Sequence, residues 1–318
     1  MSAFTIATSI DEATALMAEG ARVVAGGTDL VVGHRQGKAP LPEQVVAIDR
    51  IAELTGIAPM ADSNAGSNGT NSSGVRIGAL VTHADLMTDA TVVGSYSALA
   101  DGAALVGSPA TRNAGTIGGN IMNGSPAMDT GSPLVVLGAR FELVSARGTR
   151  VVEPGDLWTG PGETSAADDE LLVACLLPPR PRSSGSAYVR LEYRRAMEIA
   201  VVGAAASIGL DDDGSLASIR VALTAVAPTI LEVDGLDDLV GRAIDDQLLS
   251  AVAETARSQA VPISDLRASD EYRRHTVGVM AKRAVAAAAA RARGEHLAVP
   301  VNRSVGIGAS VSISGGSE

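Results

Sequence analysis

The first 60 residues show short apolar runs separated by one helical pattern. Residues Phe4–Ala7 and Arg22–Ala25 predict strands, and a third strand is expected at Val45–Asp49. Between the first two strands, Ser9 and Glu12 have the spacing of a capping box, in which each residue's side chain bonds the other's backbone amide. A helix should therefore follow Ser9 and end near Gly20. A glycine pair follows the second strand, and an apolar run resumes at 30–32.

The middle of the chain is dominated by small and polar residues at two places. Residues 61–74 are nearly all small and polar, which predicts a flexible surface loop. Residues 107–139 contain many glycines and prolines, which indicates a backbone-dominated loop system that leads into a helix over about 126–137. The other elements expected here are a strand at 76–80, a short helix capped by Thr82 through Leu86, and strands at 141–145 and 171–177.

The run Pro178–Pro181 and the serines and glycines after it indicate a domain boundary. Beyond it the pattern changes to strands followed by helices, which is typical of a compact α+β unit. The residues after Gly294 have no periodic pattern and predict an extended tail. The expected strands are 187–194, 200–210 and 219–226, and the expected helices are 245–256 and 272–293.

Composition narrows the class of protein. The chain has 318 residues, which suffices for two or three packed units. Aromatic residues make up only 2%, so the core has to be built from Ala, Val, Leu and Ile. The net charge of −11 repels phosphate backbones and therefore argues against nucleic-acid binding.

Cys175 is the one cysteine, so the chain cannot form an internal disulfide or hold an iron–sulfur cluster or a structural zinc. It lies in an apolar run and is expected to be a buried structural thiol. The four histidines are scattered without metal-ligand spacing, and they suggest no catalytic group. No 18-residue apolar span and no signal peptide are visible, so the cytoplasm is the expected location. The histidines are His34, His83, His275 and His296.

Two glycine pairs carry the candidate chemistry. They lie in Ala25–Asp29 and Thr116–Asn120. Glycine allows a positive φ and a close approach of a ligand to the backbone, and successive amides in such turns attract anions. Thr28, Thr116 and Asn120 add hydrogen-bond donors. Neither segment matches the common dinucleotide or P-loop fingerprints, so the residues alone leave two readings open: structural turns or an anion cradle.

Three longer motifs resemble the medium, flavin-binding subunit of the molybdenum hydroxylases. They are AGGTDL at 25–30, TIGGNIMNGSPAMDT at 116–130 and EYRRAMEIAVVGAA at 192–205. That family includes carbon monoxide dehydrogenase, bacterial xanthine dehydrogenases, and N-heterocycle and aldehyde dehydrogenases. Residues 263–285 also resemble the family's C-terminal domain, and the likeness extends over about residues 4–290.

The resemblance implies an α+β fold in two domains. Residues 1–178 would form a FAD-binding domain of the vanillyl-alcohol oxidase and p-cresol methylhydroxylase type, with subdomains at about 1–55 and 56–178. Residues 185–293 would form the C-terminal flavoprotein domain, a three-stranded sheet with helices, and 294–318 a tail.

The resemblance also implies a FAD site without catalytic residues or metal ligands. The two glycine motifs would hold the cofactor's pyrophosphate, and Asp129 would help to hold its sugar region. Val106 and Leu172 would be apolar contacts, and Tyr193 would face the flavin ring or lie in an interdomain contact. The implied cofactor-binding residues are Ala25, Gly26, Gly27, Thr28, Asp29, Leu30, Val106, Thr116, Ile117, Gly118, Gly119, Asn120, Asp129, Leu172 and Tyr193.

The implied function is electron transfer within a larger enzyme. A large subunit with a molybdopterin cofactor would oxidise the substrate, expected to be a purine, an N-heterocycle or an aldehyde. A small subunit with two 2Fe–2S clusters would pass electrons to FAD on this chain, which delivers them to an external acceptor, and the expected assembly is a dimer of heterotrimers. The alternatives are a carbon monoxide dehydrogenase medium subunit, a stand-alone FAD oxidase of related fold, and a scaffold that has lost its cofactor.

Overall fold

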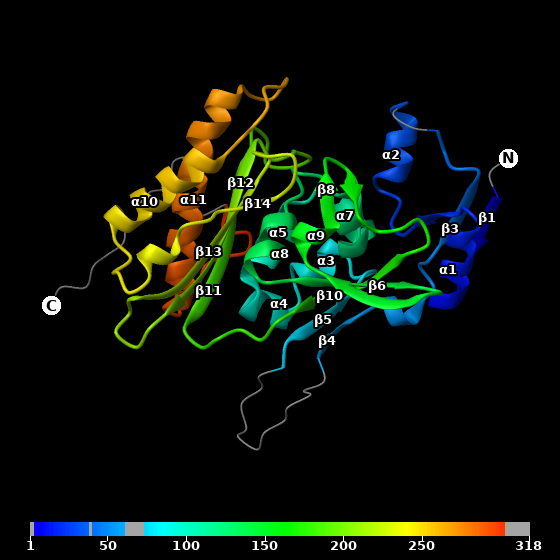
Figure 1. Cartoon of the computed structure of the whole chain (residues 1–318), viewed down its shortest axis with the longest axis horizontal. Helices are drawn as coiled ribbons and strands as arrows, with labels where there is room; N and C mark the ends of the chain where they lie inside the picture. The colour runs from blue at the N-terminus through cyan, green and yellow to red at the C-terminus, as the bar shows by residue number, and fades with distance from the viewer. Residues whose placement is uncertain (1–2, 38–39, 61–72, 303–318) are drawn as a thin grey trace, which may run out of the picture.

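The computed structural model describes residues 3–37, 40–60 and 73–302. Most of the predicted loop at 61–74 and the end of the tail lie outside these residues. Three sheets follow one another along the long axis of the molecule, with the N-terminal sheet at one end and the C-terminal sheet with its two long helices at the other (Figure 1).

The N-terminal sheet is parallel, with strand order β1-β3-β2. Helix α1 begins after Ser9, whose hydroxyl accepts from the amide of Glu12, as predicted. The other half of the capping box is different, because the Glu12 carboxylate accepts from the amide of Thr8 at 2.8 Å. The apolar run after the glycine pair is a helix, α2. The bounds are β1 Ala3–Ile6, α1 Ile10–Ala18, β2 Arg22–Val24, α2 Leu30–Arg35 and β3 Gln44–Ala47.

The central sheet is antiparallel, with order β4-β5-β10-β6-β7. Strand β10 (Leu171–Leu177) has the predicted bounds and is buried on both faces, which explains its unbroken apolar sequence. Cys175 is buried in it as predicted, and burial raises the pKa of its thiol. The other elements are η1 Ala52–Leu54, β4 Ile57–Pro59, β5 Val75–Gly78, β6 Arg140–Ser145, β7 Gly148–Val152, α9 Pro154–Leu157 and the hairpin β8 Trp158–Gly160 with β9 Glu163–Thr164.

Six short helices lie between β5 and β6. The first of them, α3, was predicted, whereas α6 and α7 correct the prediction of a loop system that begins at residue 107. Ser108 caps α6, and Pro109 occupies its first turn. Proline lacks an amide hydrogen, and this costs nothing there because amides in the first turn have no acceptor within the helix. The predicted helix over 126–137 is shorter, because the chain bends through turns until Thr130. The helices are α3 His83–Leu86, α4 Ala90–Ser95, α5 Ser97–Leu105, α6 Pro109–Ala114, α7 Ile117–Asn123 and α8 Gly131–Val136.

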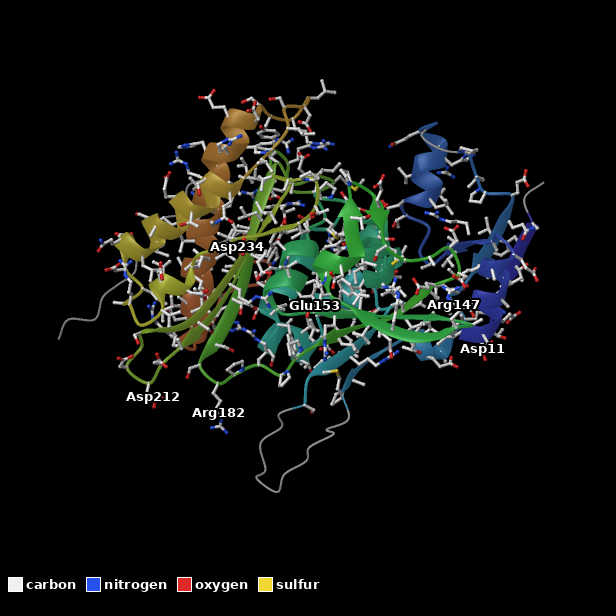
Figure 2. The ribbon with its side chains drawn as sticks, viewed as in Figure 1. Asp11, Arg147, Glu153, Arg182, Asp212 and Asp234 are labelled. Carbon is white, nitrogen blue, oxygen red and sulfur yellow. The ribbon has the colours of Figure 1, made fainter. Side chains whose placement is uncertain are left out.

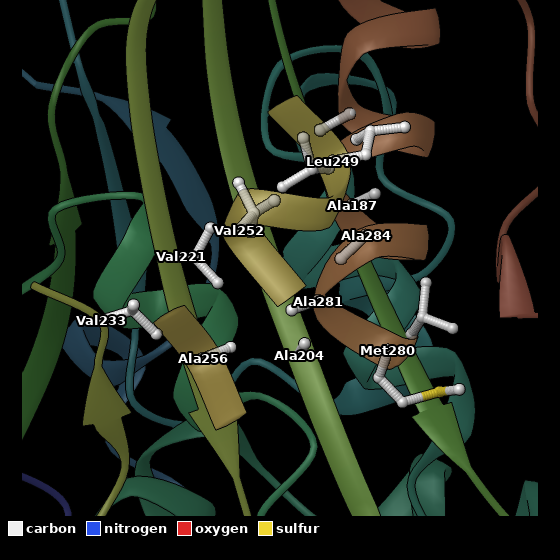
Figure 3. Close-up of a cluster of buried hydrophobic side chains, with 14 of the residues drawn as sticks. Ala187, Ala204, Val221, Val233, Leu249, Val252, Ala256, Met280, Ala281 and Ala284 are labelled. Atoms are coloured by element: carbon white, nitrogen blue, oxygen red, sulfur yellow. The ribbon is translucent and has the colours of Figure 1, made fainter. Parts of the chain in front are cut away.

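The C-terminal sheet has four strands, one more than predicted, because a short strand pairs with the third. One face is covered by the two long helices, whose side chains pack on Ala204 and Val221 (Figure 3). The opposite face contacts α5 and α8, so the sheet lies between two helical layers. The elements are β11 Ser184–Leu191, β12 Val202–Leu210, β13 Leu216–Thr224, β14 Leu231–Glu232, η2 Asp237–Leu239, α10 Asp246–Gln259 and α11 Asp270–Ala292.

Small residues let these layers approach closely. A Cβ at Gly185 of β11 would lie 2.2 Å from the carbonyl oxygen of Ala288 in α11, so the helix packs directly against the strand backbone. Adjacent residues of β12 face different layers, because Ala204 and Ala206 contact the long helices whereas Ala205 packs with the central core. The small alanine side chains therefore allow helices to pack closely against both faces of the sheet.

The residues after α11 correct the prediction of an extended tail. Val301 and Asn302 are buried. The amide of Val301 donates to Asp101 at 2.9 Å, and the Asn302 side chain accepts from the amide of Arg190 at 2.8 Å. The described part of the tail therefore crosses from the C-terminal domain back onto α5.

Charged side chains such as Asp11, Arg147 and Asp212 lie at the periphery of the molecule (Figure 2). No helix in the described ranges is long and apolar enough to cross a membrane.

Candidate cofactor site

The first glycine motif is the turn between β2 and α2. Gly27 has φ +68°, a conformation that favours glycine, and its carbonyl accepts from the amide of Val31 at the start of α2. Gly26 is needed for another reason. A Cβ there would lie 1.7 Å from the carbonyl oxygen of Ala114, which is a backbone atom. The glycine therefore permits contact with a distant segment.

The second glycine motif is the first turn of helix α7 and not a loop, which corrects the prediction. Thr116 caps the helix, and its hydroxyl accepts from the amide of Gly119 at 3.1 Å. A Cβ at Gly118 would lie 2.7 Å from Ala79, so this glycine allows α7 to pack on the segment after β5. At Gly119 an added Cβ would meet only the Thr116 hydroxyl, at 3.2 Å, and this residue is exposed.

The structure brings the two motifs together. Gly26 contacts Ala114 and Gly115, the two residues before Thr116. The hydroxyl of Thr28 lies 3.4 Å from the position of a Cβ at Gly115. Segments about 90 residues apart in sequence thus form one continuous surface of glycines and short polar side chains.

The hydrogen-bond donors are distributed unequally between the motifs. In α7 the amides of Ile117 and Gly118 donate to Val81 and Ala79, both at 2.9 Å, and those of Gly119 and Asn120 donate to Thr116. In the first motif, by contrast, the amides of Gly26, Gly27 and Thr28 have no acceptor among the described residues. The backbone anion cradle that the sequence suggested at both motifs is therefore open at the first one only.

Side chains supply the second motif's contribution. The amide oxygen of Asn120 accepts from the hydroxyl of Thr130, which leaves its NH₂ group to donate. Ile117 is fully buried in the central core, so its side chain does not reach this surface. Leu172 is likewise buried in the central core.

Asp129 is buried in an ion pair. One of its oxygens accepts from Arg190 at 2.6 Å and the other from the hydroxyl of Tyr188 at 2.9 Å. Burial raises the pKa of the Asp129 carboxyl, and the Arg190 guanidinium opposes that shift. Both partners belong to β11, so Asp129 links the region after α7 to the C-terminal sheet.

Val106 and Tyr193 lie in segments that touch each other. Val106 ends α5, and the next residue, Gly107, accepts a hydrogen bond from the amide of Met197 at 3.2 Å. Tyr193 precedes Met197 in the turn between β11 and β12, is 57% exposed, and donates from its hydroxyl to the carbonyl of Arg267. Leu30 and Asp29 lie at the start of α2, beside Gly27.

His83, which was not among the predicted site residues, lies beneath the junction of the two motifs. Its ring carbon Cδ2 lies 3.4 Å from the position of a Cβ at Gly115, and its Nδ1 has no hydrogen-bond partner in the described structure. Burial, and to a lesser degree the charge of Arg112, lowers the pKa of His83 to about 4. Its place after Thr82, a capping residue, was the one sequence signal that it begins a helix.

Acid should destabilise the protein through His83. His83 binds a proton near pH 6.5 in the unfolded chain but only near pH 4 in the folded chain. The contribution of neutral His83 to the free energy of unfolding is therefore fully present above pH 6.5 and is lost as the pH drops toward 4. The expected loss is about 3 kcal/mol. Urea unfolding at pH 7 and pH 4.5 should show a smaller pH effect for His83→Gln than for the unmodified chain. The exposed His275→Gln serves as the control, and an unchanged pH effect in His83→Gln would refute the assignment.

Comparisons with known proteins identify the family. Residues 1–180 match the family model for the FAD binding domain in molybdopterin dehydrogenase, and residues 187–288 match that for the CO dehydrogenase flavoprotein C-terminal domain. The chain is 33% identical over 295 residues to the xanthine dehydrogenase FAD-binding subunit of Escherichia coli O157:H7, covering 91% of this chain and 96% of that protein.

Solved structures agree. The chain superposes on CO dehydrogenase from Oligotropha carboxidovorans with a TM-score of 0.83 and 32% identity, over 92% of this chain and 98% of that one. For quinoline 2-oxidoreductase from Pseudomonas putida 86 the TM-score is 0.81 at 27% identity, over 92% and 98%. The chain therefore belongs to the FAD-binding subunits of the molybdenum hydroxylases. This confirms the predicted family and its mixed helix and sheet fold, in which a FAD-binding domain precedes a C-terminal domain.

Proposed function

We propose that this chain is the FAD-binding electron-transfer subunit of a molybdopterin-dependent hydroxylase. The observation that carries the proposal is the contact of Gly26 with Ala114 and Gly115, which joins the two glycine motifs into one surface. Flavin suits this role because it exchanges electrons both singly and in pairs, so it links one-electron carriers to two-electron acceptors.

The residues of this surface fit the diphosphate and sugar of FAD. The amides of Gly26, Gly27 and Thr28, which have no acceptor in the described part of the chain, would donate to the diphosphate. The Asn120 NH₂ group and the Thr28 and Thr116 hydroxyls would add side-chain donors. Asp29 and Leu30 flank the first motif, whereas Val106 and Tyr193 would lie toward the flavin ring. Ile117, Gly118 and Leu172 would support the site from the core. Asp129 would help to hold the cofactor's sugar region while it is paired with Arg190.

The remaining parts of the enzyme would lie on partner subunits. A chain with one cysteine cannot hold two 2Fe–2S clusters, so a small iron–sulfur subunit would deliver the electrons. A large molybdopterin subunit would oxidise the substrate, which we propose to be a purine, an N-heterocycle or an aldehyde. The relatives include both a xanthine dehydrogenase subunit and carbon monoxide dehydrogenase medium chains, so carbon monoxide is the second candidate substrate.

Finer features of the proposal follow the family resemblance. The FAD-binding domain would be of the vanillyl-alcohol oxidase type, with subdomains at about 1–55 and 56–178, followed by a C-terminal domain at 185–293. The parallel N-terminal sheet and the antiparallel central sheet are consistent with such a division. The assembly would be a cytoplasmic dimer of heterotrimers.

The test is a side chain placed at Gly119, on the surface that the two glycine motifs share. Gly119 has no positive φ, and an added Cβ would meet only the Thr116 hydroxyl, at 3.2 Å, which a small shift of that side chain relieves. Gly119→Leu should therefore fold, while its side chain enters the approach to the diphosphate. We expect FAD occupancy of the purified complex, measured from flavin absorbance, to fall at least about tenfold, a loss of about 1.4 kcal/mol.

The matched control is Gly94→Leu, which also adds a leucine to an exposed helical glycine, in α4, where an added Cβ meets nothing within 4 Å. It should keep full occupancy. A complex that contains molybdenum and iron but no flavin would overturn the proposed function. Substrate oxidation by the purified chain without partners would favour the stand-alone oxidase instead.

A further inference from the structure

The buried side chain of Arg190, in the C-terminal sheet, donates hydrogen bonds to three residues from two parts of the chain. Its side chain is 0% exposed, although it lies near the end of β11. An arginine has five N–H donors in a rigid fork, so one guanidinium can bind several acceptors in fixed directions. In this structure those donors reach two separate parts of the chain.

The first part is the region after α7. Nη1 of Arg190 donates to Asp129 at 2.6 Å, and Asp129 also accepts from Tyr188. The residue after Asp129, Thr130, donates to the amide oxygen of Asn120 in the second glycine motif. Arg190 is therefore connected to the proposed cofactor site through three side chains and one peptide link.

The second part is the turn at 192–199. Nε of Arg190 donates to the Glu192 carboxylate at 2.8 Å, and Nη1 also donates to the carbonyl of Glu198 at 3.2 Å. Glu192 is the first residue of the turn and Glu198 the last but one, so the guanidinium binds the turn near both of its ends. The turn itself is exposed: Tyr193 is 57% and Met197 58% exposed.

The turn also has contacts that do not involve Arg190: Tyr193 donates to the carbonyl of Arg267, and Arg194 donates to the Glu198 carboxylate at 3.1 Å. Met197 has φ +53°, a conformation that costs energy for a residue with a side chain. Its amide donates to the carbonyl of Gly107, next to Val106. The turn thus bridges the C-terminal domain and the end of α5, and the buried fork of Arg190 lies at its base.

We propose that Arg190 is a positioning residue that holds the turn 192–199, which includes Tyr193 and contacts Gly107 through the Met197 amide, at the edge of the cofactor site. The part of this proposal that concerns the cofactor rests on the proposed function, whereas the position of the turn does not. A lysine has its donors on one nitrogen, which cannot lie where both Nε and Nη1 of Arg190 lie, so Arg190→Lys should keep one ion pair and release the turn.

Another buried ion pair in the structure is the natural control. Arg291 binds Asp101 through two nitrogens, at 2.6 and 3.0 Å, and also joins the C-terminal domain to α5. Its other acceptors among the described residues are the carbonyls of Ser186 and Ala298, which lie outside the turn 192–199. Arg291→Lys should therefore weaken domain contacts to a similar degree and leave the turn in place.

The direct test is limited trypsin digestion of the full chain without FAD. Arg195 is exposed within the turn, and its peptide bond can be followed by mass spectrometry. We expect cleavage after Arg195 to be about tenfold faster in Arg190→Lys and unchanged in Arg291→Lys. Glu192→Gln, which weakens only the link to the turn, should show a smaller increase in the same direction.

The second readout is the visible circular dichroism of bound flavin in the purified complex. Arg190→Lys and Glu192→Gln should alter the flavin band, whereas Arg291→Lys should not. Equal cleavage rates in all variants, or equal acceleration in Arg190→Lys and Arg291→Lys, would overturn the proposal. Altered cleavage in a chain that binds no FAD would keep the positioning role and refute the proposed function. If Arg190→Lys does not fold, Glu192→Gln decides by the same measurements.

Discussion

Gly26→Ala is expected to abolish FAD binding. The added Cβ would lie 1.7 Å from the carbonyl oxygen and 2.5 Å from the carbonyl carbon of Ala114. These are backbone atoms of α6, so no side-chain rotation relieves the clash, and the two glycine motifs have to move apart. Since the proposed site needs donors from both motifs, we expect FAD affinity to fall at least about 100-fold, which corresponds to about 2.7 kcal/mol.

Equilibrium titration of the variant with FAD, followed by flavin fluorescence, measures this effect. The control is Gly33→Ala in α2, where an added Cβ meets nothing within 4 Å and alanine favours the helix. Gly33→Ala should bind FAD as the unmodified chain does. Undiminished binding by Gly26→Ala would show that the contact between the motifs has no part in the cofactor site.

Local signals in the sequence predicted the elements that are set by local physics. Strand β10 matched its predicted bounds because a strand buried on both faces needs an unbroken apolar run. Helices α1 and α3 started where Ser9 and Thr82 could cap them. Prediction failed at 107–139, where glycines were interpreted as loop residues. The signals Ser108-Pro109 and Thr116 mark helix starts there.

The glycines misled because glycine has two uses. Gly27 serves the turn that its positive φ requires, but Gly26 and Gly118 serve close packing against backbone from other parts of the chain. Close packing depends on which distant segments come into contact. The pattern of apolar and polar residues along the chain does not show which segments these are. The resemblance to a family supplied the pairing of the motifs, and the structure supplied its physical basis. It also showed that the amides of α7 are already paired.

The buried ion pairs were likewise beyond sequence reasoning. Asp129 and Arg190 are 61 residues apart, and Asp101 and Arg291 are 190 apart. A lone charged residue in an apolar helix or strand indicates that a counter-charge must lie nearby in the fold, but the sequence does not identify the residue that supplies it. The described part of the tail was misjudged for the same reason, because Val301 and Asn302 are held by Asp101 and Arg190 and not by a pattern of their own.

Asp101 concentrates four of these long-range contacts on one carboxylate in helix α5. Its side chain is 0% exposed and accepts from Arg291 at 2.6 and 3.0 Å, from the amide of Tyr188 at 3.1 Å and from that of Val301 at 2.9 Å. Burial raises the pKa of Asp101, and Arg291 opposes that shift. One residue therefore holds together the FAD-binding domain, β11, α11 and the segment after it.

Asp101→Ala should have the largest effect on stability of any single substitution considered. It leaves the buried guanidinium of Arg291 without a counter-charge and two buried amides without an acceptor, so the expected loss is about 4 kcal/mol in the free energy of unfolding. Urea unfolding followed by far-UV circular dichroism measures it. The double variant Asp101→Leu with Arg291→Met removes both charges and should recover at least half of the loss, because a buried ion pair can be exchanged for apolar packing. A single variant as stable as the unmodified chain would mean that the domains are held together by apolar contacts alone, and that the carboxylate serves only to neutralise Arg291.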